Sequence, residues 1–203
     1  MTDITPYDAI PETVVPGVPN RPRVLLVGTF LVCAAVIMGY AGLLGYYISQ
    51  RAAVVQSGET WLPNGTVIPL TQPNFMMFTL SWSIISVLWA LHAVKRNDQS
   101  NALIAFGLTL LFGFAQVVQT GYLLTIMEMV AAESSRAVLI YALVGVQLGV
   151  MAAAMGFIAV MALRTLGGDY SERDYEGVLS ATVFWIMSVG VYTALWYAVY
   201  ITK

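Results

Sequence analysis

The sequence predicts an all-α fold: a polytopic membrane protein with five transmembrane helices in a bundle. Of its 203 residues, 59% are hydrophobic and 10% are charged, whereas soluble domains carry about 25% charged residues. A water-soluble domain of this size could not cover its surface with so few charges. A membrane-spanning helix needs about 20 apolar residues, and five such runs lie between the charged residues. They are Val24–Gln50, Phe75–Val94, Ala102–Met127, Ala137–Leu163 and Val178–Ile201.

Each run is expected to be a helix. Backbone groups in lipid are satisfied only in helices or closed barrels, and the runs lack the period-two alternation of barrel strands. None of them contains Asp, Glu, Lys or Arg, and the single histidine, His92, lies near the end of the second run. The first run begins after residue 23 and is too long for a secretory signal, so it is interpreted as a retained helix.

Two domains and an orientation follow from the prolines and the basic residues. Residues 1–23 hold five of the eight prolines and are predicted to be an extended tail, followed by a transmembrane domain over 24–203. If the N-terminus is cytoplasmic, the inner side holds Arg21, Arg23, Lys95, Arg96, Arg164 and Arg173, and the outer side holds Arg51, Arg136 and Lys203. The excess of basic residues inside favours an N-in, C-out topology with a cytoplasmic tail.

A few side chains within or beside the predicted helices are candidates for contacts with other helices, with a neighbouring subunit or with lipid. A buried amide in lipid needs a partner, so Gln116, Gln119 and Gln147 are expected to bond across helices or to a neighbouring subunit. Basic residues at the end of the second helix are able to hold an anionic lipid head group. Close helix packing is expected at Gly39, Gly42 and Gly45. The candidate lipid or subunit contacts are His92, Lys95, Arg96, Gln116, Gln119, Gln147 and Trp185.

Several functions are excluded by composition. Nine basic and eleven acidic residues nearly cancel, which argues against a nucleic-acid partner. One cysteine and one histidine leave no internal disulfide, cysteine cluster, copper centre, haem bis-ligation or zinc hydrolase site within the chain. The helices contain no acid pair, no serine with a nearby base and no glycine-rich phosphate loop. The residues alone indicate a non-catalytic membrane subunit with no cofactor or metal of its own.

Ordered motifs along residues 21–203 give a further indication. The loop Trp61-Leu62-Pro63-Asn64-Gly65 is similar to Trp-Pro-Pro-x-Gly, and Trp89-Ala90-Leu91-His92 with Asp98 is similar to Trp-Ala-His-His and its following Gly-Asp. Basic Arg21-Pro22 precedes the first helix, Phe112 to Gln116 resembles a third-helix motif, and Trp185 a fifth-helix motif. Together these motifs resemble subunit III of the haem–copper oxidases in its short, five-helix form.

The chain departs from that family where the family keeps ionisable residues. The Glu of the first helix corresponds to Val36, and the Glu-Tyr of the third corresponds to Gln119 and Thr120. The histidines of the fourth helix align with Gln147 and Val150, and the His and Asp of the fifth with Ile186 and Val189. The resemblance therefore describes a divergent member whose scaffold is kept and whose polar interior is replaced.

The resemblance implies an accessory subunit of a respiratory cytochrome c oxidase complex in a bacterial cytoplasmic membrane. Such a subunit would stabilise the catalytic subunit I and bind phospholipids, with haem and copper held by the partner subunits. Three alternatives remain open at this point. They are a related complex (a nitric oxide reductase or a membrane monooxygenase), a transporter working alone, and an assembly factor that leaves the mature complex.

Overall fold

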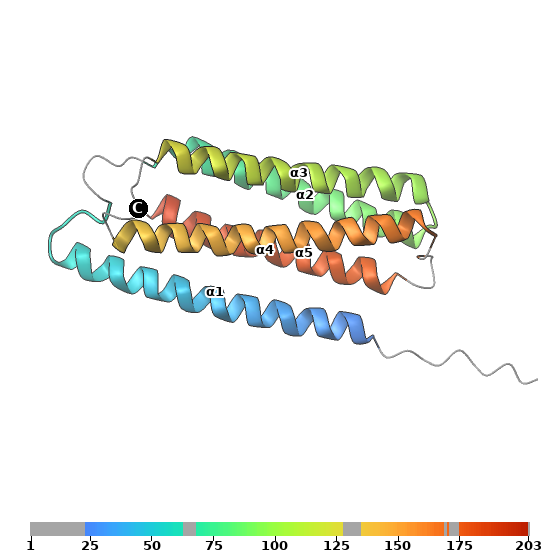
Figure 1. Ribbon diagram of the computed structural model, residues 1–203, viewed down its shortest axis with the longest axis horizontal. Coiled ribbons are helices and arrows are strands. Elements are labelled where there is room, and N and C mark those ends of the chain that lie inside the picture. The colour runs from blue at the N-terminus through green and yellow to red at the C-terminus, as the bar shows by residue number, and fades with distance from the viewer. Residues whose placement is uncertain (1–22, 63–67, 128–134, 169, 171–174, 203) are drawn as a thin grey trace, which may run out of the picture.

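A computed structural model describes residues 23–62, 68–127, 135–168, 170 and 175–202 (Figure 1). No strand occurs in these ranges, so the predicted all-α class is confirmed. The helices are α1 (Val24–Gln56), α2 (Thr71–Lys95), α3 (Gln99–Ile126), α4 (Ser135–Leu166) and α5 (Glu176–Leu195), and α5 continues into the π-helical segment η1 (Trp196–Ile201). All five helices are long and apolar enough to cross a membrane. The predicted tail lies, except for Arg23, outside the described residues.

Each helix extends beyond its predicted uncharged run at one end or at both. Helix α1 continues past Gln50 and takes in Arg51, whose guanidinium donates a hydrogen bond to Thr202 Oγ1 at 3.2 Å. Pro73 falls in the first turn of α2, where the backbone N–H that proline lacks has no intrahelical partner. At 33 residues, α1 is about 50 Å long. It therefore exceeds the hydrocarbon core and either tilts or projects beyond it.

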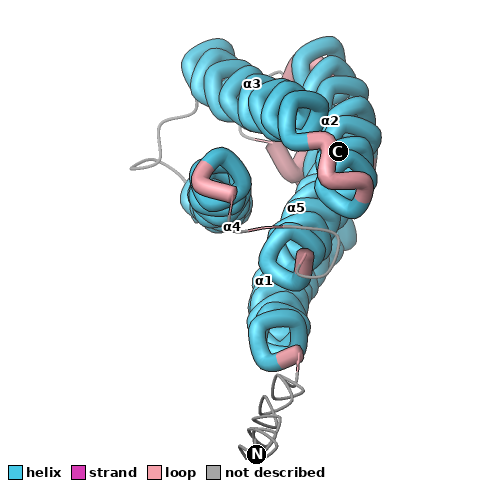
Figure 2. Tube along the Cα trace, turned by 90° about the vertical axis from the view of Figure 1, so that its right-hand side faces the viewer, coloured by secondary structure: helices cyan, strands magenta, loops and turns pink. Residues whose placement is uncertain are grey.

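Helix α5 is the centre of the bundle and α1 is its edge. In the most apolar part of each helix, 67% of the residues are buried for α5 and 17% for α1. Helix α5 contacts α1, α2 and α4, while α2 and α3 pair as neighbours. Viewed along the bundle, α1 lies at one side against α5 (Figure 2). A Cβ at Gly39, Gly42 or Gly45 would meet nothing within 4 Å among the described residues, so the close packing predicted there is not found within the chain.

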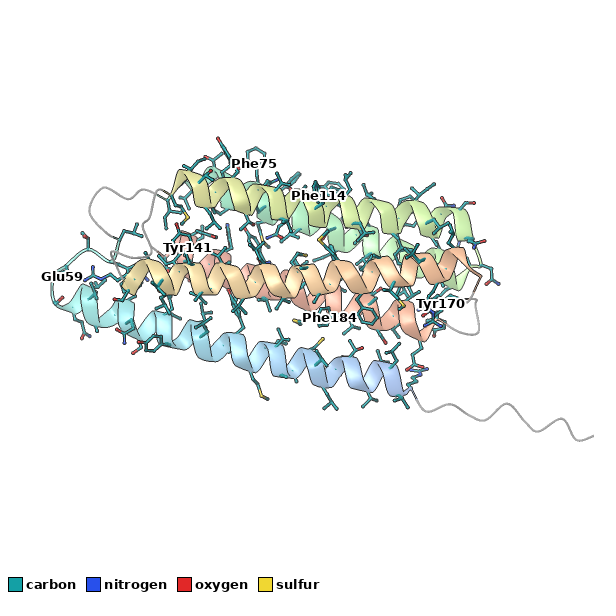
Figure 3. All side chains as sticks on the ribbon, viewed as in Figure 1. Glu59, Phe75, Phe114, Tyr141, Tyr170 and Phe184 are labelled. Carbon is teal, nitrogen blue, oxygen red and sulfur yellow. The ribbon has the colours of Figure 1, made fainter. Side chains whose placement is uncertain are left out.

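The outer surface of the bundle is apolar over most of its length. Large side chains such as Leu31 and Met38 on α1 are well exposed, as are Phe75 on α2 and Phe114 on α3. Figure 3 shows the last two on the outside of their helices. A surface of this kind is stable only in lipid or against other apolar protein. The fold is therefore that of a multi-pass membrane protein.

A tight turn joins α2 to α3. Asn97 adopts the left-handed conformation with φ of 54°, which asparagine tolerates better than most residues. Asp98 then caps α3, because its Oδ1 accepts from the Asn101 backbone N–H at 3.1 Å and its Oδ2 from Asn101 Nδ2 at 2.6 Å. The side-chain and backbone hydrogen bonds from Asn101 hold the pKa of the Asp98 carboxyl below its ordinary value of 3.8.

The lowered pKa of Asp98 predicts a stability that depends on pH. A folded-state pKa below the unfolded value means that the carboxylate stabilises the fold at neutral pH. This contribution is lost as the pH falls through the folded pKa. Asp98→Ala is expected to lower the thermal midpoint at neutral pH, and this loss should shrink progressively as the pH is lowered below 3.8. The midpoint is measured by thermal unfolding of the purified protein in detergent at neutral pH and at acidic pH.

Asp98→Asn is the matched control, because asparagine also caps helices but does not titrate. It should retain most of the stability at neutral pH and lose the acid dependence that Asp98 contributes. An equal loss at both pH values in Asp98→Ala would contradict the assignment.

Candidate functional site

Polar side chains line the interior between α2, α3, α4 and α5. Hydrocarbon offers them no hydrogen bond, so a polar atom left unpaired here is costly. They are the chemically distinctive feature of an otherwise apolar bundle and form the candidate site. The almost fully buried members on these helices are Ser83, Ser86, Thr109, Gln116, Thr120, Gln147, Thr165, Ser180, Thr182 and Ser188.

The largest of the buried side chains, Trp185 on α5, joins this interior to α2. Its Nε1 donates to Ser83 Oγ at 3.0 Å, and Ser83 Oγ donates in turn to the Leu80 carbonyl at 2.6 Å. The far edge of the indole lies against Gly113 of α3, where a Cβ would stand 2.8 Å from Trp185 Cη2. Trp185 thus fixes the spacing of three helices and has no exposed surface.

One helical turn away, a pair of hydroxyls joins α2 to α3. Ser86 Oγ and Thr109 Oγ1 are 2.7 Å apart, and either atom is able to donate. Each hydroxyl also lies within hydrogen-bond distance of a backbone carbonyl of its own helix, Ser86 of Ser83 and Thr109 of Ala105. The hydroxyl that donates across the pair does not donate to its carbonyl, and the other one does. The pair leaves neither hydroxyl unsatisfied, and its role is structural.

Two glutamines join α3 to α4. Gln116 Nε2 donates to Gln147 Oε1 at 3.2 Å and also lies 3.2 Å from Thr120 Oγ1. The Thr120 hydroxyl oxygen lies 2.9 Å from the backbone carbonyl oxygen of Gln116 and 3.4 Å from Met76 Sδ on α2, and its proton is able to bond either. The amide pair and the threonine therefore connect three helices through neutral groups.

A second polar cluster closes the end of the bundle where α1 finishes. Trp61 Nε1 donates to Tyr47 Oη at 3.1 Å, with the two rings edge to face at 5.3 Å between centroids. Arg136 donates to the Thr60 carbonyl at 2.8 Å and pairs with Glu59 Oε2 at 2.6 Å. These contacts attach the loop after α1 to the start of α4. Sequence reasoning missed the hydrogen bond between Trp61 and Tyr47, although a tryptophan in the polar loop after α1 was an available signal.

The opposite end of the bundle is held by a carboxylate that sequence reasoning also missed. Glu176 Oε1, at the start of α5, accepts from the Leu26 backbone N–H at 3.0 Å. The first N–H groups of a helix lack partners within it and attract negative charge, so Glu176 caps α1 from a neighbouring helix. At the same end, Lys95 Nζ lies 4.7 Å from the centroid of the Tyr175 ring.

A groove runs between α1 and α5, with a volume of about 510 Å³. Its walls are almost wholly apolar, with Phe30, Ile37 and Leu44 on α1 and Ile186 and Val191 on α5. A hydrocarbon chain would match this groove in size and in polarity.

The structure places the predicted contact residues at two separate levels. It brings Gln116 and Gln147 together and buries both of them, as it buries Trp185, away from the outer surface. Gln119 is half-buried on α3. Gln116 and Gln147 lie within the middle part of α3 and α4, whereas His92, Lys95 and Arg96 are exposed together at the C-terminal end of α2. His92 and Lys95 belong to the last turn of α2, and Arg96 is its C-terminal cap residue.

Fold and site together define a class: a multi-pass membrane protein with five helices in its described residues and an interior whose buried polar groups are neutral amides and hydroxyls. Among the described residues, no three His, Cys, Asp or Glu side chains gather in a way that could hold a metal ion.

Comparison with known proteins adds one distant likeness. No family model matches the chain. The chain is 30% identical over 103 residues to a probable cytochrome c oxidase subunit 3 of Mycobacterium bovis, a match covering 51% of this chain and 49% of the relative. The same figures hold for the probable cytochrome c oxidase subunit 3 of two strains of Mycobacterium tuberculosis. The chain thus spans about half the length of the curated relatives it matches. The likeness supports the family suggested by the sequence motifs.

Proposed function

We propose that the chain is a non-catalytic accessory subunit of a cytochrome c oxidase type of respiratory complex in a bacterial cytoplasmic membrane. The observation that carries the proposal is the 30% identity over 103 residues to probable cytochrome c oxidase subunit 3 proteins. Five membrane-length helices agree with it. The interior favours a scaffold over a reaction centre, because its buried polar groups are neutral amides and hydroxyls, some of them bonded to one another, such as Ser86 with Thr109.

The partner would be the catalytic subunit of the complex, with haem and copper bound there. This chain has a single histidine and a single cysteine, and its Cys33 is buried in α1. Its contribution would be to pack against the catalytic subunit in the membrane and stabilise it. The exposed apolar side chains of α1 and α2 provide surface for such packing or for lipid.

Phospholipid binding is part of the same proposal. The apolar groove between α1 and α5 offers about 510 Å³ for acyl chains. Lys95 and Arg96 lie exposed at the end of α2, where they could attract an anionic head group. The two features provide for the two parts of a phospholipid at separate places on the bundle.

An N-in, C-out orientation also belongs to the proposal. Arg23, Lys95, Arg96 and Arg164 stand at the end of the bundle where α1 begins, and Arg51 and Arg136 stand toward the other end. The larger number of basic residues marks the cytoplasmic side.

Purification of the tagged full-length chain from its native membranes in mild detergent tests the proposed complex. A haem-bearing catalytic oxidase subunit is expected to co-purify in stoichiometric amount, recognised by its visible absorption and by mass spectrometry. An unrelated tagged multi-pass protein from the same membranes is the control for non-specific carry-over. Recovery without any haem-bearing partner would overturn the proposal. A nitric oxide reductase or a monooxygenase subunit in its place would assign the chain to a different complex.

Replacing Lys95 and Arg96 together with glutamine is expected to reduce the anionic phospholipid retained on purification. A basic residue near an anionic surface contributes about 1 kcal/mol to lipid attraction, so losing both should weaken binding by about 2 kcal/mol, or roughly thirtyfold, and lower retention accordingly. Mass spectrometry of extracted lipids measures the effect. The control is Lys95→Arg with Arg96→Lys, which keeps both charges. Equal retention in all three proteins would show that these residues serve only to set the topology.

A further inference from the structure

Two amide atoms at the α3–α4 contact are buried and unpaired. Gln116 and Gln147 are 0% and 1% exposed, and a single hydrogen bond of 3.2 Å joins Gln116 Nε2 to Gln147 Oε1. The remaining atoms of the two amides, Gln116 Oε1 and Gln147 Nε2, have no hydrogen-bond partner in the described part of the chain. One acceptor and one donor are therefore left over on two side chains that already touch.

This result does not depend on how the amide oxygen and nitrogen atoms are assigned. Exchanging O and N in only one glutamine would place two like groups 3.2 Å apart, which is repulsive. Exchanging them in both glutamines gives an equivalent bond and again leaves one donor and one acceptor. Either assignment leaves one donor and one acceptor, which a single molecule able both to donate and to accept would satisfy.

A third unpaired atom lies on the same helix. Gln119 follows Gln116 by three residues, a spacing that places two side chains on neighbouring positions of a helix surface. Its Oε1 is also buried without a partner in the described residues. Together the three glutamines present one donor and two acceptors, or two donors and one acceptor if the oxygen and nitrogen of the Gln119 amide are exchanged. A water molecule satisfies either set with its two lone pairs and two hydrogens. Buried waters in proteins make about three hydrogen bonds each.

We propose that Gln116, Gln119 and Gln147 bind one buried water molecule between α3 and α4. A buried, unpaired amide group costs about 1 to 3 kcal/mol, and the surrounding lipid has no group to offer it. A cation is a poor occupant because no carboxylate faces the pair: the acidic residues of the described helices, such as Glu176, lie at helix ends. The proposal concerns the chain itself and does not depend on which complex it joins.

Solid-state NMR of the full chain in lipid bilayers tests the proposal on the wild-type protein. With ¹⁵N in glutamine and tryptophan side chains, the Gln147 side-chain N–H is expected to show a through-space cross-peak to water. The internal control is the Trp185 indole N–H, which is equally buried but bonded directly to Ser83 and should show none. Gln147→Leu, in which the peak disappears, supplies the assignment.

The NMR measurement distinguishes a bound water from a direct bond between the two amides. A water cross-peak at Gln147 together with silence at Trp185 supports the site. Silence at both, with the glutamine amides bonded to each other in a reciprocal pair, overturns it. A structure of the full chain at a resolution that shows ordered water provides an independent readout. It should contain a water within hydrogen-bond distance of Gln116 and Gln147, and a direct two-bond amide pair with no water would again overturn the proposal.

Discussion

Replacing Trp185 with alanine is expected to lower the free energy of unfolding by about 3 kcal/mol, the low end of the range for such changes in protein cores. The indole is fully buried and donates to Ser83 at 3.0 Å. Because the bilayer is as apolar as the bundle interior, little of the loss comes from transfer out of water. It arises from packing contacts that the cavity removes and from the lost hydrogen bond. Reversible unfolding in mixed detergent micelles measures the effect.

Trp89→Ala is the matched control for this change. Trp89 lies on α2 with 40% of its surface exposed, so lipid chains are able to fill the space that the substitution leaves. A loss within about 0.5 kcal/mol is expected, as for most surface substitutions. If both alanine variants lost the same stability, Trp185 would have no special place in the packing of the bundle.

Replacing Gly113 with a larger residue is expected to destabilise the contact between α3 and Trp185 by overpacking it, whereas Trp185→Ala leaves it underpacked. A Cβ at this position would stand 2.8 Å from Trp185 Cη2 and 3.0 Å from Met155 Cγ. Met155 is able to move, but the indole is held by its bond to Ser83. Overpacking of this kind costs about 1 to 3 kcal/mol, so Gly113→Val should fall toward the upper end of that range in the same unfolding assay.

Gly107→Ala is the control on the same helix. Nothing lies within 4 Å of its ideal Cβ position, so the better helix propensity of alanine should leave stability unchanged or raise it by up to about 1 kcal/mol. Trp185→Phe combined with Gly113→Ala provides a further check, because the smaller ring leaves room for the added methyl group. The combined loss should be less than the sum of the two single losses. Simple additivity would contradict direct contact between the two positions.

The number and nature of the helices were predictable because they depend on local chemistry. A run of about 20 apolar residues has few alternatives to a helix in lipid, and all five predicted runs, apart from the last residue of the third, lie in helices of membrane length. The ends were predicted less well. Treating the charge of Arg51 as a boundary placed the end of α1 too early, because a hydrogen bond to Thr202 accommodates this residue inside the helix.

The partners of the polar side chains were only partly predictable. Sequence reasoning expected interhelical bonds from the glutamines, and Gln116 and Gln147 form one. It did not anticipate that Glu176 caps α1, since their partner atoms are separated by 150 residues. For the glycines of α1, the predicted close packing is not found among the described residues. A spacing that permits close approach requires a neighbouring helix, and at Gly39, Gly42 and Gly45 the described chain provides none.

The amino-acid sequence by itself determined that this protein is a bundle of five apolar helices with few charges between their ends. Those properties arise from the composition of each segment and from the requirement that backbone groups in lipid bond within a helix. Only the tertiary structure decided that α5 is central, that Trp185 meets Gly113, and that two glutamines share one bond and leave two amide atoms unpaired. Neighbours of this kind depend on how helices far apart in the chain pack together, and a pattern within one helix does not specify its partner.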